Sequence, residues 1–341
     1  MKLYAKIISA CAVLIMLASC KEQATQTAEK EHAISVTDTK GNLVTLDKPA
    51  ERIVCLFDPA LDLLTMLGAT DKVVGIPIDV YVDQELYQPF SLLNQDIANK
   101  TIKTPGSNEL QQLEEIVALK PDLLIVQNLN PGMVQTLKNM GVATYMFTSE
   151  SQANLMQELQ DVSVLTGKQE RGLELENYAK SQFAKLTEQA NAIPEKQRKS
   201  VYFTWANGRI YSTTGRNSMM NDCLVLAGTT NVCTSAIDQP NINPETLVSW
   251  NPDMIVMWND DPNLFYKKPE LANVTAIKNK AIHNLMPMFF YNPHTLKSIC
   301  AAIAIKEWAY GNQENANAQV REVIEVLYGK EKAQNLLTLL N

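Results

Sequence analysis

The chain has 341 residues, of which 46% are hydrophobic and 20% are charged, and its formal net charge is -7. This length and composition are ordinary for a globular protein and suffice for two domains with sizeable cores. The acidic balance and the lack of any basic stretch argue against a nucleic-acid partner, because lysine and arginine would have to neutralise the phosphates.

Residues 1–20 have the pattern of an export signal. Lys2 and Lys6 precede an apolar run of about 11 residues, which is too short to span a bilayer. The tetrapeptide Leu-Ala-Ser-Cys then ends at Cys20 and matches the cleavage box of bacterial lipoproteins, in which the cysteine carries lipid. Residues 21–33 are polar and contain no Phe, Trp or Tyr, so we expect a flexible tether. The sequence therefore predicts a lipid-anchored protein on the periplasmic side of a bacterial membrane or at the cell surface.

Residues 34–150 predict a first α/β lobe. Residues 34–46 alternate apolar and polar side chains around a Lys-Gly-Asn turn, which indicates a β-hairpin. Apolar runs and turn residues after it predict strands at 52–57, 73–76 and 142–147, with helices at 60–67 and 133–140. This alternation of strands and helices is typical of a parallel sheet with helices on both faces.

One sequence pattern occurs twice, in distant halves of the chain. In residues 113–126, and again in residues 244–257, a glutamate stands seven residues before a Pro-Asp pair that opens a short apolar run. Each copy predicts a short helix, a stop imposed by proline and a buried parallel strand. The repeat implies two similar α/β lobes and puts Glu114 and Glu245 at equivalent positions, one in each lobe.

Residues 151–196 predict a helical linker between the two lobes. No strand pattern occurs there, and Gly167 interrupts the segment before a predicted helix at 168–191. About 24 helical residues extend roughly 36 Å, which is long enough to lie across both lobes, although a surface helix within one domain is the alternative.

Residues 197–341 predict the second lobe and its closing helices. Strands are expected at 200–205 and, after a turn at Gly208, at 210–212, and a further strand and loop at 283–291. Helices are expected at 218–227, 295–310 and 317–340.

Four cysteines remain beyond the predicted signal and lipid site: Cys55, Cys223, Cys233 and Cys300. Their spacing matches no zinc or iron–sulfur pattern. Outside the cytoplasm, Cys223 and Cys233 can close a short disulfide loop, and four buried thiols are the alternative.

Several segments together resemble the substrate-binding lipoproteins of bacterial ABC importers for iron–siderophore complexes, haem and cobalamin. The resemblance extends from about residue 34 to 311, and it is carried by residues 52–54, 67–69, 73–76, 113–126, 165–168, 227–232, 245 and 251–253. It implies a helical-backbone (class III) binding protein, with two Rossmann-like lobes joined by one long helix and ligand held between them. It also implies that Glu114 and Glu245 dock on the permease, whose ATPase subunits supply the energy. The alternative is that each glutamate only favours its helix N-terminus.

Strand ends and the loops after them predict the ligand-binding residues, because parallel sheets bind ligands beyond the carboxyl ends of their strands. Aromatic rings there can stack on a flat ligand, and a guanidinium can hold a carboxylate or an oxyanion. For each aromatic residue, packing in the core is an equally good interpretation. The predicted set is Asp58, Tyr81, Asn128, Trp205, Arg209, Tyr211, Trp258, Asn259, Tyr291 and His294.

The ligand is predicted to be a metal-containing complex of the iron–siderophore or haem type. Cobalamin is less favoured, because the family's ring-stacking Trp is missing where residues 238–241 read Asp-Gln-Pro-Asn, and residues 104–108 are small and polar. A runner-up is the oxyanion molybdate or tungstate, with donors from Ser107, Asn128, Arg209, Arg216 or Asn217. Arg216 and Asn217 stand at a predicted helix start, which suits an anion or is simply a cap.

No catalytic motif is found for the alternative of an extracellular hydrolase or redox enzyme. The chain has three histidines, which share no metal-ligand spacing, so neither a bare metal site nor a resident cofactor is predicted. We expect a monomeric binding protein that performs no chemistry itself.

Overall fold

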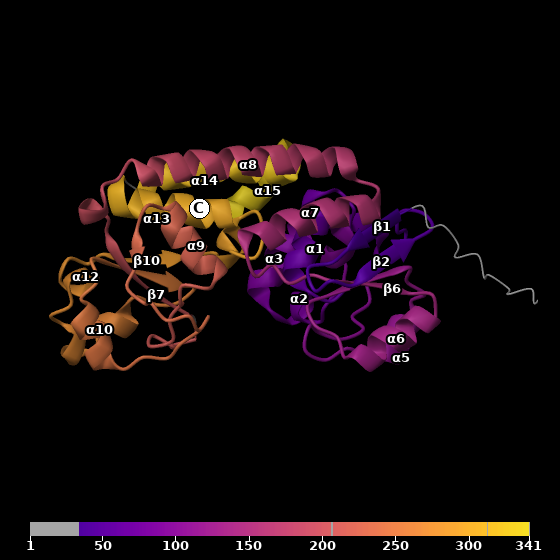
Figure 1. Cartoon of the computed structure of the whole chain (residues 1–341), viewed down its shortest axis with the longest axis horizontal. Helices are drawn as coiled ribbons and strands as arrows, with labels where there is room; N and C mark the ends of the chain where they lie inside the picture. The colour runs from indigo at the N-terminus through magenta and orange to yellow at the C-terminus, as the bar shows by residue number, and fades with distance from the viewer. Residues whose placement is uncertain (1–33, 206, 312, 341) are drawn as a thin grey trace, which may run out of the picture. The chain divides into compact units, whose positions relative to one another are not determined.

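The computed structural model describes residues 34–205, 207–311 and 313–340 (Figure 1). The predicted signal, the lipid-bearing Cys20 and the tether of residues 21–33 lie outside this part of the chain. Within it, no helix combines the length and apolarity that crossing a membrane requires.

The first lobe contains the predicted hairpin and a four-stranded parallel sheet. Strands β1 and β2 pair antiparallel, and the sheet has the order β4-β3-β5-β6. The strands are β1 (Ile34–Thr37), β2 (Leu43–Leu46), β3 (Ile53–Cys55), β4 (Val73–Gly75), β5 (Leu123–Val126) and β6 (Ala143–Met146). The helices are α1 (Asp58–Met66), α2 (Asp79–Val82), α3 (Gln84–Leu93), α4 (Gln95–Ala98), α5 (Leu113–Ala118) and α6 (Pro131–Asn139).

The second lobe contains another four-stranded parallel sheet, in the order β10-β9-β7-β8. Its strands are β7 (Ser200–Thr204), β8 (Thr230–Asn231), β9 (Met254–Trp258) and β10 (Ile282–Leu285). The helices of this half are α9 (Met219–Leu226), α10 (Pro244–Trp250), α11 (Asn263–Tyr266), α12 (Thr275–Lys278), α13 (Ser298–Tyr310), α14 (Gln313–Tyr328) and α15 (Lys330–Leu336). Two parallel α/β sheets confirm the predicted fold class.

Two predicted elements differ from the structure. The strand expected at 210–212 is absent, because the Ser212 N–H bonds to the Arg209 carbonyl and closes a tight turn after Gly208. Ser212 makes only an isolated bridge with Asn241. The helix expected at 317–340 is divided into α14 and α15 by Gly329, whose φ of 78° is outside the helical range.

Helices α7 (Gln152–Thr166) and α8 (Gln169–Asn191) carry the chain from the first sheet to the second. Gly167, with φ 69°, ends α7, and the close approach of α8 needs Gly172, where an added Cβ would lie 2.4 Å from Ser163 Cβ. Helix α8 has 23 residues, so it is about 35 Å long. It packs on α7 and on the second-lobe helices α9 and α13, and Figure 1 shows it running along α14.

Successive residues along a strand point to opposite faces of its sheet, and the two faces belong to different hydrophobic clusters. Val54 and Leu124 face a cluster within the first lobe, and Tyr202 and Ile255 face one within the second. The opposite faces, with residues such as Ile53 and Phe203, contribute to one large cluster that also includes α8, α13 and α14. The two lobes are therefore joined by a common apolar core.

The duplicated Pro-Asp pair has the same structural role in both lobes. Asp122 accepts the backbone N–H groups of Glu51 at 2.8 Å and Arg52 at 3.0 Å, which connects the start of β5 to that of β3. Asp253 accepts the Ser200 N–H at 2.9 Å and connects β9 to β7 in the same way. The aspartates hold the amino ends of the central strands together. The repeat in the sequence therefore corresponds to a repeat in the structure.

Candidate functional site

A pocket of about 790 Å3 lies between the two lobes, where the sequence predicts that the ligand is held. From the first half of the chain it is lined by residues that follow β5 and β6 and by the start of α7. From the second half it is lined by the start of α9, by Asp238 and by His294. The lining residues are Gln127, Thr148, Glu150, Ser151, Asn154, Arg216, Asn217, Ser218, Met219, Asp222, Asp238 and His294.

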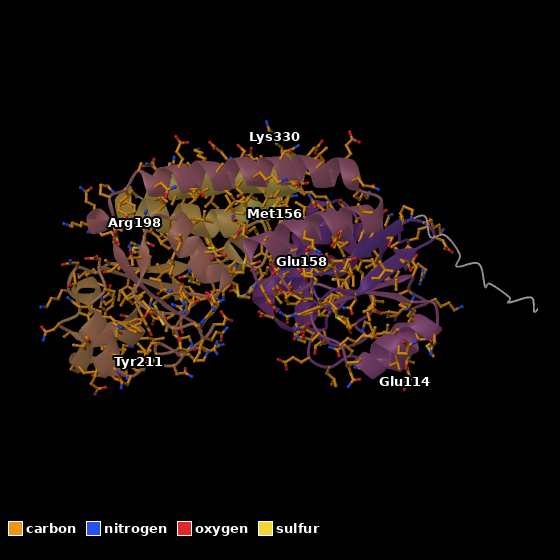
Figure 2. All side chains as sticks on the ribbon, in the orientation of Figure 1. Glu114, Met156, Glu158, Arg198, Tyr211 and Lys330 are labelled. Atoms are coloured by element: carbon orange, nitrogen blue, oxygen red, sulfur yellow. The ribbon has the colours of Figure 1, made fainter. Side chains whose placement is uncertain are left out.

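The first-lobe wall is the loop after β6, which is held from behind by Glu158 of α7. Glu158 Oε1 accepts the backbone N–H of Thr148 at 2.6 Å and that of Ser149 at 2.9 Å. Ser149 has φ 47°, a left-handed conformation that is unfavourable for residues other than glycine. Figure 2 shows Glu158 in the interior beneath α7.

His294 crosses from the second half of the chain to this loop. Its Nδ1 lies 3.0 Å from the Ser149 carbonyl oxygen, and the Ser149 hydroxyl donates to the His294 carbonyl at 2.7 Å. Because a carbonyl oxygen only accepts, Nδ1 carries the hydrogen, and Nε2 of the neutral ring is an acceptor.

The second-lobe wall is the segment that begins α9. Ser218 caps this helix by accepting the Asn221 N–H at 3.1 Å, and the Asn221 side chain donates to the Arg216 carbonyl at 3.1 Å. Gly215 is required here, because an added Cβ would lie 1.9 Å from the Ile237 carbonyl oxygen. These contacts fix the backbone that presents Arg216 and Asn217.

Charges of both signs line the pocket. Lys40 lies 2.8 Å from Glu150 and offsets that carboxylate. Burial raises the pKa of Asp222, and it raises the pKa of Asp238 against the opposing effect of His294. The lining thus has more acidic side chains than the single arginine, Arg216. His294 is the only residue of the lining that has a ring.

Of the ten predicted ligand-binding residues, only His294 lines this pocket. Asp58 and Trp258 line a separate cavity of about 30 Å3, together with Lys297. Asn128 lines a neighbouring groove of about 330 Å3 that shares Gln127 with the pocket.

The remaining predicted aromatic residues are engaged in packing or in hydrogen bonds. The Trp205 indole N–H donates to Thr213, and the Tyr81 hydroxyl donates to Ile102. Tyr291 is 3% exposed within the common core. Tyr211 packs on the second-lobe cluster, whereas Arg209 and Asn259 are not among the residues that line the pocket.

The sequence prediction missed most of the polar lining. Gln127 and Thr148 directly follow the apolar runs that form β5 and β6. Both could therefore have been predicted, because parallel sheets bind ligands beyond the carboxyl ends of their strands. Asp222 gave no such signal, since it lies within α9. The runner-up residues Arg216 and Asn217 do line the pocket, whereas Ser107 does not.

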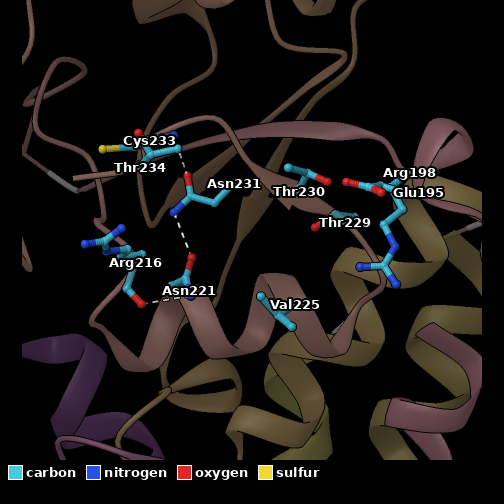
Figure 3. A pocket seen from close by; sticks show the side chains of 10 residues that line it. All are labelled: Glu195, Arg198, Arg216, Asn221, Val225, Thr229, Thr230, Asn231, Cys233 and Thr234. Atoms are coloured by element: carbon cyan, nitrogen blue, oxygen red, sulfur yellow. Dashed lines mark hydrogen bonds between the residues drawn. The ribbon is translucent and has the colours of Figure 1, made fainter. Parts of the chain in front are cut away.

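A second pocket, of about 490 Å3, is formed by residues of the second half of the chain alone (Figure 3). Its central polar group is Asn231, whose amide donates to Asn221 and accepts the Cys233 N–H, each at 3.0 Å. Because these groups satisfy one another and the first lobe contributes nothing, the pocket between the sheets is the better candidate site.

The two repeated glutamates are both exposed. Each is the second residue of its helix, Glu114 in α5 and Glu245 in α10. Figure 2 shows Glu114 at the outer edge of the first lobe. Lys120 and Asn251, with φ 49° and 45°, stand at matching positions directly before the proline of each copy.

The four cysteines in the described residues are free and buried, which is the alternative to a bridge between Cys223 and Cys233. In the same residues, no group of three or more His, Cys, Asp or Glu side chains is arranged to hold a metal ion.

A comparison with protein families matches residues 53–287 to a family described as "Periplasmic binding protein". A similar sequence is an "Uncharacterized ABC transporter substrate-binding lipoprotein", YvrC, from Bacillus subtilis, 22% identical over 69% of this chain and 74% of that protein. Another is a cobalamin-binding protein of Halobacterium salinarum, 24% identical over 63% of this chain and 56% of that protein.

Among solved structures, a molybdate-bound periplasmic binding protein of Haemophilus influenzae, MolA, superposes with a TM-score of 0.71 at 19% identity. The superposition covers 88% of this chain and 98% of the other. At this identity the likeness establishes the fold and leaves the ligand open.

Proposed function

Because this chain belongs to the periplasmic binding protein family and is the substrate-binding component of an ABC transporter, we propose that its cargo is a hydrophilic metal chelate of the iron–siderophore type. The family consists of transport proteins rather than enzymes, so the pocket captures cargo without changing it. The observation that carries the proposal is the polar pocket of about 790 Å3 between the two sheets.

The size of the pocket supports a chelate over a bare ion. Pockets of roughly 300–1,000 Å3 suit drug-sized ligands, whereas a single ion would leave most of such a space to water. The lining offers amide, hydroxyl and guanidinium donors, which suit the oxygen atoms of such a chelate. Its carboxylates suit the positive charge or the N–H and O–H groups of the chelate. A haem or corrin ring would instead need a broad apolar surface, which these residues do not offer.

The charge of the lining narrows the class of chelate. Asp222 and Asp238 remain after Lys40 offsets Glu150, and Arg216 is the one strong cation among the lining residues. A neutral or positively charged complex, such as a ferric trihydroxamate, is therefore favoured over a ferric tricatecholate, which carries several negative charges.

The test is a thermal-shift series on the purified protein with ferric trihydroxamate, ferric tricatecholate, haem, cobalamin and molybdate. A ligand at 100 times its dissociation constant adds about 2.7 kcal/mol to the free energy of unfolding and raises the Tm. We expect the trihydroxamate to give the largest shift and Asp238→Asn to change that shift. A shift with haem or cobalamin alone would refute the proposed ligand class.

A second candidate is an oxyanion such as molybdate, because Arg216 and Asn217 line the pocket at the start of α9. The Ser218 hydroxyl, however, is already used in the cap of this helix and in a bond to Gly215. A Tm shift with molybdate that disappears in Arg216→Gln would favour this candidate.

The proposed partners follow from the transport role. Exposed Glu114 and Glu245 would contact the permease, one from each lobe, and complementary charge on the permease would orient the encounter. Lipid on Cys20 would hold a monomeric protein at the outer side of the membrane. Metabolic labelling with a fatty acid, lost in Cys20→Ser, tests the anchor.

A further inference from the structure

The carboxyl group of Glu158 is a buried polar group that the proposed ligand contacts do not use. Its side chain is fully buried, and its Oε1 is also 3.3 Å from the Thr148 hydroxyl and 3.4 Å from the Thr39 hydroxyl. Burial raises the pKa of Glu158 to about 7, against the hydrogen bonds from Ser149 and Thr148. Burying a carboxyl group away from water reduces the free energy of unfolding unless hydrogen bonds within the protein replace those to water.

The hydrogen bonds of Glu158 end on a strained segment. Ser149, with its φ of 47°, is held by the bond from its N–H to Glu158, and Thr148 beside it is held by a second bond. Left-handed residues other than glycine are strained and persist where their surroundings fix them. Glu158 supplies that constraint from α7, and Thr39 supports it from the turn of the β1–β2 hairpin.

The strained residue is the one that contacts His294. Two hydrogen bonds join Ser149 to His294, and the one to Nδ1 sets which ring nitrogen carries the hydrogen. A continuous set of contacts therefore connects Glu158, Ser149 and the imidazole in the pocket, across 136 positions of sequence from 158 to 294.

We propose that Glu158 is a positioning residue, which fixes the loop of Thr148 and Ser149 and thereby the orientation and tautomer of His294. It acts through Ser149 and does not touch the cargo. This inference rests on the proposed function, because it assigns His294 a role toward the ligand of that pocket.

The test compares Glu158→Ala and Glu158→Gln with a control, Glu176→Gln. Glu176 is also a buried helical glutamate, but it is bound by Gln160 and Lys180 and does not line the pocket. Two properties are measured: the ¹⁵N NMR shifts of the His294 ring, which report its tautomer, and the dissociation constant for ferric trihydroxamate.

Glu158→Ala should convert the ring to a mixture of tautomers and weaken binding about tenfold, because a ring in the wrong tautomer loses its hydrogen bond to the ligand. Glu158→Gln, whose amide oxygen can still accept the two N–H groups, should have a smaller effect on both properties. The control should match the wild-type protein.

An Ala variant that folds, and that keeps both the wild-type ring shifts and the wild-type affinity, would overturn the inference. If this variant does not fold, Ser149→Gly is added, because glycine adopts a φ of 47° without strain. The double variant should then bind less tightly than Ser149→Gly alone, and equal affinities would overturn the inference. If the wild-type protein binds none of the ferric chelates, the proposed function fails, whereas the ring shifts still decide the positioning role.

Discussion

The carboxylate of Asp62 lies 2.8 Å from Nζ of Lys297, and the two side chains are only 3% and 1% exposed. Asp62 belongs to α1 of the first lobe, whereas Lys297 directly precedes α13. The Tyr328 hydroxyl also donates to Asp62 at 2.5 Å, and the ring of Phe289 lies 3.3 Å from the lysine nitrogen. A buried ion pair thus joins the two halves of the chain inside their common core.

Removing one partner of this pair should strongly destabilise the protein. Asp62→Asn leaves Lys297 charged and buried, and we expect the free energy of unfolding to fall by about 3–5 kcal/mol. Urea denaturation measures this loss. Asp62→Asn combined with Lys297→Met should lose less than the sum of the single changes, because no unpaired charge remains. Additive losses would contradict a direct interaction, and Lys48→Met, at an exposed pair with Glu51, is the control.

Stability should depend on pH through Asp58, which lines the small cavity beside this pair. Burial and then the nearby Asp62 raise the pKa of Asp58 from 3.8 to about 7, while Lys297 opposes the shift. The folded protein then binds more protons than the unfolded chain between these values, so the free energy of unfolding falls as the pH rises through them.

Asp58→Asn should remove part of the slope of the free energy of unfolding against pH. The urea midpoint, measured between pH 4 and 7.5, which is about the interval between the two pKa values, reports this slope. Glu158, whose pKa is likewise raised to about 7, should account for part of the remaining slope. An unchanged slope in Asp58→Asn would mean that Asp58 has an ordinary pKa in the folded protein.

Charge reversal at both repeated glutamates should separate transport from binding. Glu114→Lys with Glu245→Lys should reduce uptake by on the order of tenfold or more, because the charges that would face the permease are inverted. Affinity for the cargo should stay unchanged, since neither residue lines the pocket. Uptake in cells and equilibrium binding to the purified protein measure the two effects.

A matched control for this prediction is Glu115→Lys with Glu270→Lys, which makes the same change in net charge at two other exposed glutamates. The control pair should leave uptake near the wild-type rate. Equal losses in both double variants would indicate an effect of net charge, and a loss of affinity in the first would place its glutamates in the ligand site.

The four described cysteines should be unreactive in the folded protein. Burial raises the pKa of Cys55 and Cys300 to about 12 and raises that of Cys223 as well, so little thiolate forms at neutral pH. Maleimide should label none of these four in the native protein and all four after unfolding, as counted by mass spectrometry. Labelling of only Cys55 and Cys300 after unfolding would reveal a bridge between Cys223 and Cys233.

The sequence predicted the lobes well because each of their signals is local. A Pro-Asp pair followed by a short apolar run specifies the start of β5 and of β9, and glycines mark the helix ends. Helices α2 and α4 have only four residues each, and α3 contains Pro89, so periodicity gave no signal for them. The strand predicted at 210–212 failed because a turn takes the Ser212 N–H, and the neighbouring backbone bonds amount to an isolated bridge rather than a ladder.

The pocket could be predicted only in part, because its walls depend on contacts between distant residues. The bonds between Ser149 and His294 join positions 145 apart, and nothing local to either residue indicates them. Large aromatic residues at strand ends or in the segments after them, such as Trp205 and Tyr291, instead pack into or against the common core. Polar residues after β5 and β6, such as Gln127 and Thr148, form part of the lining instead.

The apolar core that the two sheets share bears on the kinetics of capture. Because opening the lobes widely would expose part of that core, the empty protein should be close to its loaded form before the cargo arrives. Association should then not wait for a large conformational change, and complex lifetime rather than capture speed should set the affinity. The permease would then distinguish the loaded protein from the empty one mainly by contacts with the exposed cargo. A change in the distance between the two lobes would contribute less.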